Sequence, residues 1–183
     1  MLQTIKPIHL RPYTLDDKGA CLSLLDSNTP RFFAPHERDE FSTFLDDPGD
    51  RYWVVEDDTG TVIACSGYWI VSDTPVAVIT WTMVARSWHG RDVGRWLLLT
   101  CLHHLCRIPA VQIVTLETSQ HVTGFYEQVG GFRVQEITEN GYAPGLHKIK
   151  MRREMTLDGC ATIAQQLSAL RIHEILARSG ARE

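Results

Sequence analysis

Two hydrophobic periodicities divide the chain into strands and helices. Apolar residues at helical spacing predict helices at 15–25, 37–45, 93–106 and 119–129, and a helical tail at about 158–178. Alternating or continuous apolar runs, rich in β-branched and aromatic residues, predict seven strands. These strands are expected at 9–14, 51–56, 62–71, 76–84, 111–117, 132–138 and 146–155. Hairpin-linked strands followed by β-α-β crossovers indicate one mixed sheet with helices on its faces.

The domain organisation follows from this order of elements. We expect a single domain over 1–155, with no internal repeat or linker, and a C-terminal helical extension over 156–183. The extension carries an amphipathic stripe. Such a stripe packs either on its own domain or on a second subunit, so a homodimer is an open alternative.

Charge and hydropathy exclude several classes of protein. The chain of 183 residues has a formal net charge of −4, which argues against nucleic-acid binding, because phosphate contacts need a concentrated basic face. No stretch has the uninterrupted apolar length of a membrane span, and the first twelve residues do not resemble a signal peptide. We therefore expect a cytoplasmic protein with no membrane partner.

The cysteines predict neither a zinc site nor a disulfide framework. Their number is odd and none belongs to a C-x-x-C pair. Burial as small hydrophobic residues in a reducing cytoplasm is the preferred interpretation. The five are Cys21, Cys65, Cys101, Cys106 and Cys160.

The turn between the strand at 76–84 and the helix at 93–106 carries the strongest chemical signal. Gly90 and Gly94 let a phosphate approach the backbone, and Arg91 and Arg95 add charge-assisted hydrogen bonds. The free N–H groups at the start of the helix complete an anion site. The glycine spacing matches neither G-x-G-x-x-G nor the P-loop, which disfavours dinucleotide and nucleoside-triphosphate folds.

Residues 84–98, VARSWHGRDVGRWLL, resemble the acetyl-CoA motif of the GNAT superfamily of N-acetyltransferases, V-x-P-x-x-[QR]-x-x-G-x-[GA]. His89 stands where the family has Gln or Arg, and Asp92 where the first Gly is usual. Residues 124–132, GFYEQVGGF, are similar to the family's F-Y-x-x-x-G-F signature. The resemblance covers about 9–155. It implies an α/β (α+β) fold with a mixed, mostly antiparallel sheet of six to seven strands, splayed at the centre, and helices on both faces.

The resemblance also implies roles for individual residues. Acetyl-CoA would be the co-substrate and an amine the acceptor, with no metal. Tyr126 is the family's candidate general acid, and Glu117 is the best candidate base because the strand at 76–84 has no carboxylate. His121 and a water chain are second choices as base. The expected cofactor-binding residues are Met83, Val84, His89, Gly90, Arg91, Asp92, Val93, Gly94, Arg95 and Ser119; the expected substrate-binding residues are Phe32, Phe33, Tyr142 and His147, and His147 is also a second-choice base.

Plainer interpretations stay open beside these roles. Aromatic residues at 32 and 33 are equally explained as core contacts, and a tyrosine at 126 could position the cofactor sulfur without transferring a proton. The whole chain could also be a GNAT-shaped module that binds acyl-CoA without turnover. His89, Asp92 and the missing strand carboxylate keep that alternative open.

Overall fold

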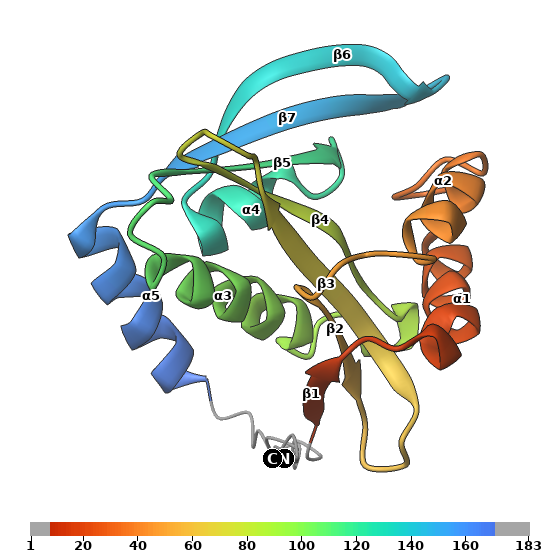
Figure 1. Cartoon of the computed structure of the whole chain (residues 1–183). Coiled ribbons are helices and arrows are strands. Elements are labelled where there is room, and N and C mark those ends of the chain that lie inside the picture. Colours follow the sequence, from red (N-terminus) through yellow and green to blue (C-terminus); the bar gives the residue numbers. More distant parts are fainter. Residues whose placement is uncertain (1–7, 171–183) are drawn as a thin grey trace.

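The computed structural model describes residues 8–170 and contains one seven-stranded sheet (Figure 1). The strands lie in the order β1-β2-β3-β4-β5-β7-β6. All neighbours are antiparallel except β4 and β5, which are parallel and joined through α3. The strands are β1 (His9–Pro12), β2 (Tyr52–Glu56), β3 (Val62–Ile70), β4 (Val76–Val84), β5 (Ile113–Ser119), β6 (Arg133–Ala143) and β7 (Leu146–Glu154).

Helices cover the two faces of the sheet unequally. On one face α1 and α2 pack over β2, β3 and β4, while α3, α4 and α5 lie on the other (Figure 1). Among residues 8–170, no helix covers β5, β7 and β6 on the α1–α2 side (Figure 1). The helices are α1 (Lys18–Asn28), α2 (Glu37–Phe44), α3 (Val93–Cys106), α4 (Thr123–Gly130) and α5 (Leu157–Ala169), with 3-10 turns η1 (Leu15–Asp17) and η2 (Arg86–Trp88).

Strand alternation decides which residues meet the helices. On β5 and β7, Val114, Leu116, Ile149 and Met151 are buried in the core cluster that also contains α3. Residues between them therefore point to the opposite, open face. That face carries Thr115, Glu117, Lys148 and Lys150.

Most predicted elements are confirmed, and β4 and α3 have the predicted bounds. Several boundaries differ by a few residues, among them both ends of α1 and of β5. For two elements the cause is local. The helix α4 begins at 123 and not at the predicted 119, because β5 continues to Ser119. A turn follows, in which the N–H of Val122 donates to the carbonyl of Ser119. β6 runs to Ala143 through an irregular stretch in which Asn140 has a left-handed φ of 54° and its side chain accepts from Gly145.

The C-terminal helix α5 packs on α3 of the same chain, and Ile163 is buried in the shared core. A disulfide between Cys106, at the end of α3, and Cys160 joins the two helices. The prediction of no disulfide is therefore wrong for this pair. The two cysteines are 54 positions apart in sequence and meet only because α5 folds back onto α3. The other three are free and buried, as expected: Cys21, Cys65 and Cys101. The predicted tail beyond residue 170 lies outside the described residues.

Candidate active site

The sheet opens at its centre between β4 and β5. The two strands pair only from Val76↔Ile113 to Val78↔Thr115, although β4 continues to Val84 and β5 to Ser119. The expected splay is thus confirmed. It leaves main-chain groups along the diverging halves of two central strands available to a ligand.

A cleft of about 730 Å³ occupies this opening and extends over the open face of the sheet. Its lining combines the splayed strands with residues from α1, α2, α3, α4 and the β6–β7 hairpin. Those relevant to chemistry are Phe32, Phe33, Glu37, Glu40, Trp69, Trp81, Met83, Val84, His89, Gly90, Gly94, Glu117, Ser119, Phe125, Tyr126, Tyr142, Lys148 and Lys150.

The turn into α3 stands at one end of the cleft. Gly90 has a φ of 74° and Asp92 a φ of 59°, so the chain makes two left-handed steps before Val93 starts the helix. A carbon added at Gly90 would meet nothing within 4 Å, and one added at Gly94 would lie 3.5 Å from Val84. The glycine at 90 is therefore needed for its backbone conformation, whereas a side-chain carbon at 94 would make only ordinary van der Waals contact with β4.

The two arginines of this turn differ in exposure and in contacts. The guanidinium of Arg91 lies 5.0 Å from the centre of the Trp88 ring, a cation–π contact on an exposed side chain. The Nε atom of Arg95 is buried, and among residues 8–170 it has no hydrogen-bond partner. The ring of His89 contributes Nε2 at 2.9 Å from the carbonyl of Val84, which fixes the turn against β4.

Asp92 does not cap α3 with its side chain. Its left-handed backbone brings the main-chain carbonyl, rather than the carboxylate, to the helix, where the carbonyl accepts from the N–H of Trp96 at 2.9 Å. The side chain is exposed. The carboxylate therefore does not bond the helix amides that a phosphate would need.

Main-chain geometry selects one amide that faces the opening. Ala85 donates its N–H to Ile63 of β3, and the register pairs Met83 with Cys65. Because hydrogen-bonding direction alternates along an antiparallel strand, the N–H of Val84 points away from β3, toward the gap. Its carbonyl already accepts from His89 and from the side chain of Asn28.

Ser119 and Tyr126 line the cleft beside this amide. The Oγ atom of Ser119 is buried at the end of β5 and has no partner among the described residues. Such an orphaned hydroxyl fits a polar ligand in the gap. Tyr126, on α4, is 8% exposed, and burial raises the pKa of its hydroxyl well above the ordinary value. The phenol therefore stays protonated at neutral pH.

Glu117 forms an ion pair on the open face. One of its oxygens lies 2.7 Å from Nζ of Lys148, and that ammonium also lies 5.9 Å from the ring centre of Tyr142. Burial, followed by the negative charges of Glu37 and Glu117, raises the pKa of Tyr142. The expected base and one expected substrate contact are thus neighbours.

Glu37 is a functional candidate that the sequence did not suggest. It begins α2, it is 6% exposed, and it lines the cleft. Its Oε2 accepts from the N–H of Ala34 at 2.6 Å. A carboxylate at a helix start is an ordinary feature, so only its place in the tertiary structure distinguishes Glu37 from its exposed neighbours Asp39 and Glu40.

The remaining predicted substrate residues separate into two groups. Phe32 and Phe33 line the cleft, and the Phe33 ring stacks on Trp81 at 6.3 Å. His147 is absent from the cleft lining. Its Nδ1 accepts from the N–H of Asn140 in the β6–β7 hairpin. The structure gives His147 a place in the hairpin turn and does not bring it together with the other candidates.

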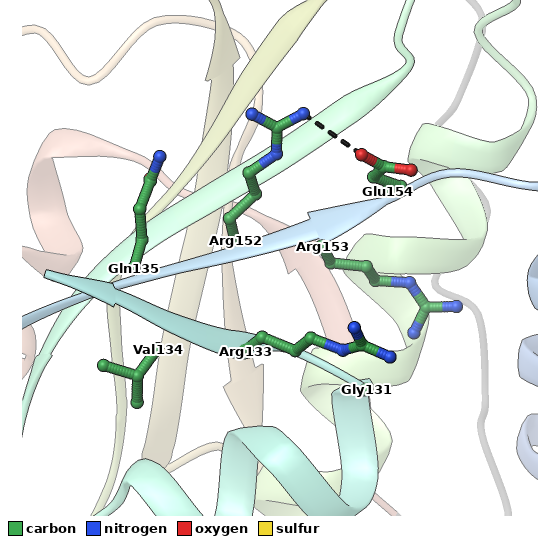
Figure 2. Close-up of a pocket in the computed structure, with 7 residues that line it drawn as sticks. All are labelled: Gly131, Arg133, Val134, Gln135, Arg152, Arg153 and Glu154. Atoms are coloured by element: carbon green, nitrogen blue, oxygen red, sulfur yellow. Dashed lines mark hydrogen bonds and ion pairs between the residues drawn. The ribbon is translucent and has the colours of Figure 1, made fainter.

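A second hollow, of about 480 Å³, lies at the other end of the β6–β7 hairpin (Figure 2). Two of its three arginines are already engaged. Arg152 pairs with Glu154 at 3.2 Å, and Arg153 donates to the carbonyl of Gly130 at the end of α4. Arg152 and Arg153 also extend in different directions, as the alternation of β7 requires (Figure 2). This hollow is not a built anion site.

Residues 8–170 contain neither a metal-binding cluster nor a membrane-spanning helix. No group of three or more His, Cys, Asp or Glu side chains is arranged to hold a metal ion there. No helix in the same range is long and apolar enough to cross a membrane.

Several solved structures share this fold. A protein assigned to the GNAT acetyltransferase family from Desulfovibrio desulfuricans is 24% identical, with a TM-score of 0.65, covering 81% of this chain and 99% of that one. The ribosomal-protein-S18-alanine N-acetyltransferase from Escherichia coli is 18% identical, with a TM-score of 0.66 and coverage of 82% and 95%. A mutant of the spermidine N-acetyltransferase SpeG from Vibrio cholerae is 16% identical, with a TM-score of 0.61 and coverage of 81% and 94%.

The comparison with curated proteins gives no significant match. The comparison with family models gives one, to the acetyltransferase (GNAT) family over residues 21–132. This range holds more than half of the 183 residues and both motifs of the sequence analysis, from α1 to the phenylalanine that follows α4. The splayed sheet, the glycine turn and the family match agree, and the chain is a member of the acetyltransferase (GNAT) family.

Proposed function

We propose that this enzyme transfers an acetyl group from acetyl-CoA to a primary amine of a small molecule or a peptide, by direct attack in a ternary complex. The observation that carries the proposal is the cleft between the diverging halves of β4 and β5, which joins an anion-binding turn to a buried tyrosine. The GNAT family uses acetyl-CoA as the acyl donor.

The residues around the cleft fit this donor. The turn at 89–95 would hold the diphosphate through the helix N–H groups and the charges of Arg91 and Arg95. The amide of Val84 and the orphaned hydroxyl of Ser119 would bind the pantetheine arm, with Met83 in the wall of the gap. A backbone N–H beside the thioester carbonyl would stabilise the negative charge that develops on its oxygen.

Tyr126 is the proposed general acid. As the amine nitrogen forms its bond to the acetyl carbon, the carbon–sulfur bond breaks and the sulfur leaves with its electron pair. The phenol of Tyr126 would donate its proton to that sulfur. A thiol is ordinarily more acidic than a phenol by about 1.5 pKa units, so the donation has to compete with departure of a free thiolate.

For the acceptor, we propose only the reacting group, which is a primary amine. Neighbours with this fold act on an alanine of ribosomal protein S18 and on spermidine, according to their names. The fold is therefore compatible with both peptide and small-molecule amines. Glu117 is a candidate to accept the amine proton, since it lines the acceptor side of the cleft.

The alternative of a non-catalytic acyl-CoA-binding module has one supporting observation. Asp92 places a carboxylate beside the proposed diphosphate turn, and like charges repel. A module of this kind would bind acetyl-CoA and release no thiol in the presence of amines.

Incubation with acetyl-CoA and a panel of amines separates these possibilities, with free thiol as the readout. Turnover above the rate of acetyl-CoA hydrolysis supports the proposal. Thermal stabilisation by acetyl-CoA without turnover on any amine supports the binding module. Stabilisation by NAD instead of acetyl-CoA would refute both.

Two lesser proposals accompany the activity. We propose a cytoplasmic location on the hydropathy argument alone, since the disulfide removes the argument from cysteine usage. We propose a homodimer formed through a surface other than the stripe of α5, since that helix packs on α3 of its own chain. Fractionation of the native host cell tests the first, and light scattering of the purified protein tests the second.

A further inference from the structure

A carboxylate is enclosed at the acceptor end of the cleft. Glu37 reaches the cleft from the first turn of α2 while only 6% of the residue is exposed. The hydrogen bond from Ala34 engages Oε2. The described hydrogen bonds leave Oε1 available to a ligand that enters the cleft.

The groups that face Glu37 come from three elements. His36 and Glu40 lie on either side of it in sequence, Lys148 reaches toward it from β7, and Tyr142 approaches from β6. Lys148 is held by Glu117 at 2.7 Å. The sheet cation whose charge acts on Glu37 is thus already paired with another carboxylate.

Burial has a chemical consequence for this side chain. Removal from water raises the pKa of Glu37, and the hydrogen bond from Ala34 and the positive charges nearby offset only part of the effect. A carboxylate with a raised pKa is a stronger proton acceptor than an exposed one. Glu40, one turn further along α2, is exposed and lines the same cleft.

We propose that Glu37 is the carboxylate that binds the ammonium group of the acceptor and removes its proton, and that the acceptor is a primary amine joined to an apolar group. This inference rests on the proposed acetyl transfer. It makes Glu37, rather than Glu117, the base of the reaction.

The proton inventory of the step balances. The bound ammonium gives one proton to Glu37, which becomes a neutral carboxylic acid, and a neutral amine remains. The nitrogen lone pair forms the bond to the acetyl carbon, and the carbon–sulfur bond breaks with its electrons on sulfur. Tyr126 gives its proton to sulfur, nitrogen loses its second proton to water, and water returns a proton to the Tyr126 phenolate. Glu37 then returns its proton to water.

The lining of the cleft indicates the rest of the acceptor. Three carboxylates line it against two lysines, one of which is paired, so an additional anion on the acceptor is unfavourable. The same cleft is lined by aromatic side chains that remain partly exposed, Phe33 and Trp81. A ring or alkyl group would cover their surface and gain hydrophobic free energy.

The pH dependence of Glu37→Gln tests the role of this residue. The glutamine keeps an oxygen for the Ala34 N–H, so the turn before α2 should fold as before. With the amine that the wild type acetylates fastest, kcat/KM of Glu37→Gln at pH 7 should fall by at least about 100-fold. Below the pKa of the amine it should rise by about tenfold per pH unit, because the variant must wait for amine that is already neutral. The wild-type profile should be flatter.

The control is Asp39→Asn, which removes an exposed carboxylate from the same helix at a position outside the cleft lining. It should retain the wild-type rate and profile. Glu117→Gln tests the other candidate base. If Glu117→Gln acquires the steep pH profile and Glu37→Gln keeps the flat one, the proposed base is wrong. A purely structural role of Glu37 would lower thermal stability and leave the shape of the profile unchanged, which also overturns the proposal.

Three probes test the acceptor class: 2-phenylethylamine, phenylalanine and 1,4-diaminobutane. The first should have the highest kcat/KM, since it combines one cation with an apolar ring. A higher value for either of the others refutes the acceptor class. If the wild type acetylates no amine at all, acetyl transfer itself fails, and that result is distinct from any change in the order of acceptors or in the variant profiles.

Discussion

The disulfide between Cys106 and Cys160 makes a quantitative prediction about stability. Replacing both cysteines by serine opens a covalent loop, since the two residues are separated by 54 positions. A cross-link restricts the unfolded chain more than the folded one. For a loop of this length, the chain-entropy model gives about 4 kcal/mol of lost stability. Since a domain of this size loses about 2–4 °C in Tm per kcal/mol, Tm should fall by about 10 °C.

The assay is thermal unfolding of the wild type and of the double serine variant, each with and without a reducing agent. Reduction should lower the Tm of the wild type to that of the variant and leave the variant unchanged. The intact mass without reductant should show one disulfide and three free thiols, at Cys21, Cys65 and Cys101. Five free thiols in the oxidised protein, or a wild-type Tm that is insensitive to reduction, would refute the reasoning.

Three further predictions concern single side chains. Tyr126→Phe should lower kcat by about 100-fold or more with little change in the KM for acetyl-CoA, and an unchanged rate means that Tyr126 is not the acid. Gly130→Ala should lower the free energy of unfolding by about 1–3 kcal/mol in a urea titration, because the added carbon would lie 2.6 Å from the ring of Phe132. The control is Gly124→Ala on the same helix, where the added carbon meets nothing within 4 Å and should cost no stability. Burial raises the pKa of Asp17, but the paired Arg11 guanidinium and the N–H of Thr14 outweigh it, so the pKa lies below its ordinary value. The resulting stability should be present above about pH 4 and lost as pH falls through the lowered pKa, and Arg11→Leu should flatten this dependence in urea titrations between pH 2 and 6.

Apolar periodicity and turn residues predicted those elements whose ends are set by neighbouring residues in the sequence. The strand β4 and the helix α3 appear with their predicted bounds because an apolar β-branched run and a glycine turn define both ends. The start of β5 was placed two residues early. Val111 continues the apolar run, but the N–H groups of Gln112 and Ile113 bond the carbonyl of Pro75 before the sheet ladder begins.

In the candidate site, too, the sequence indicates residues that belong to a local motif and misses those that only tertiary packing brings in. Residues of the turn and the two motif segments could be found from the sequence, because their spacing carries the signal. Glu37 could not, since it reaches the cleft from α2, far in sequence from both motifs, and has no distinctive neighbour pattern. The pair Cys106 and Cys160 was missed for the same reason, because only the packing of α5 on α3 brings the two residues together.

The most direct test of the whole account is a crystal structure of the protein with bound CoA. We expect the diphosphate within hydrogen-bonding distance of the amides at 89–95, and the pantetheine arm between β4 and β5 with its sulfur beside Tyr126. Phosphates bound at another surface, or strands that close against each other between Val84 and Leu116 and leave no room for the arm, would contradict it.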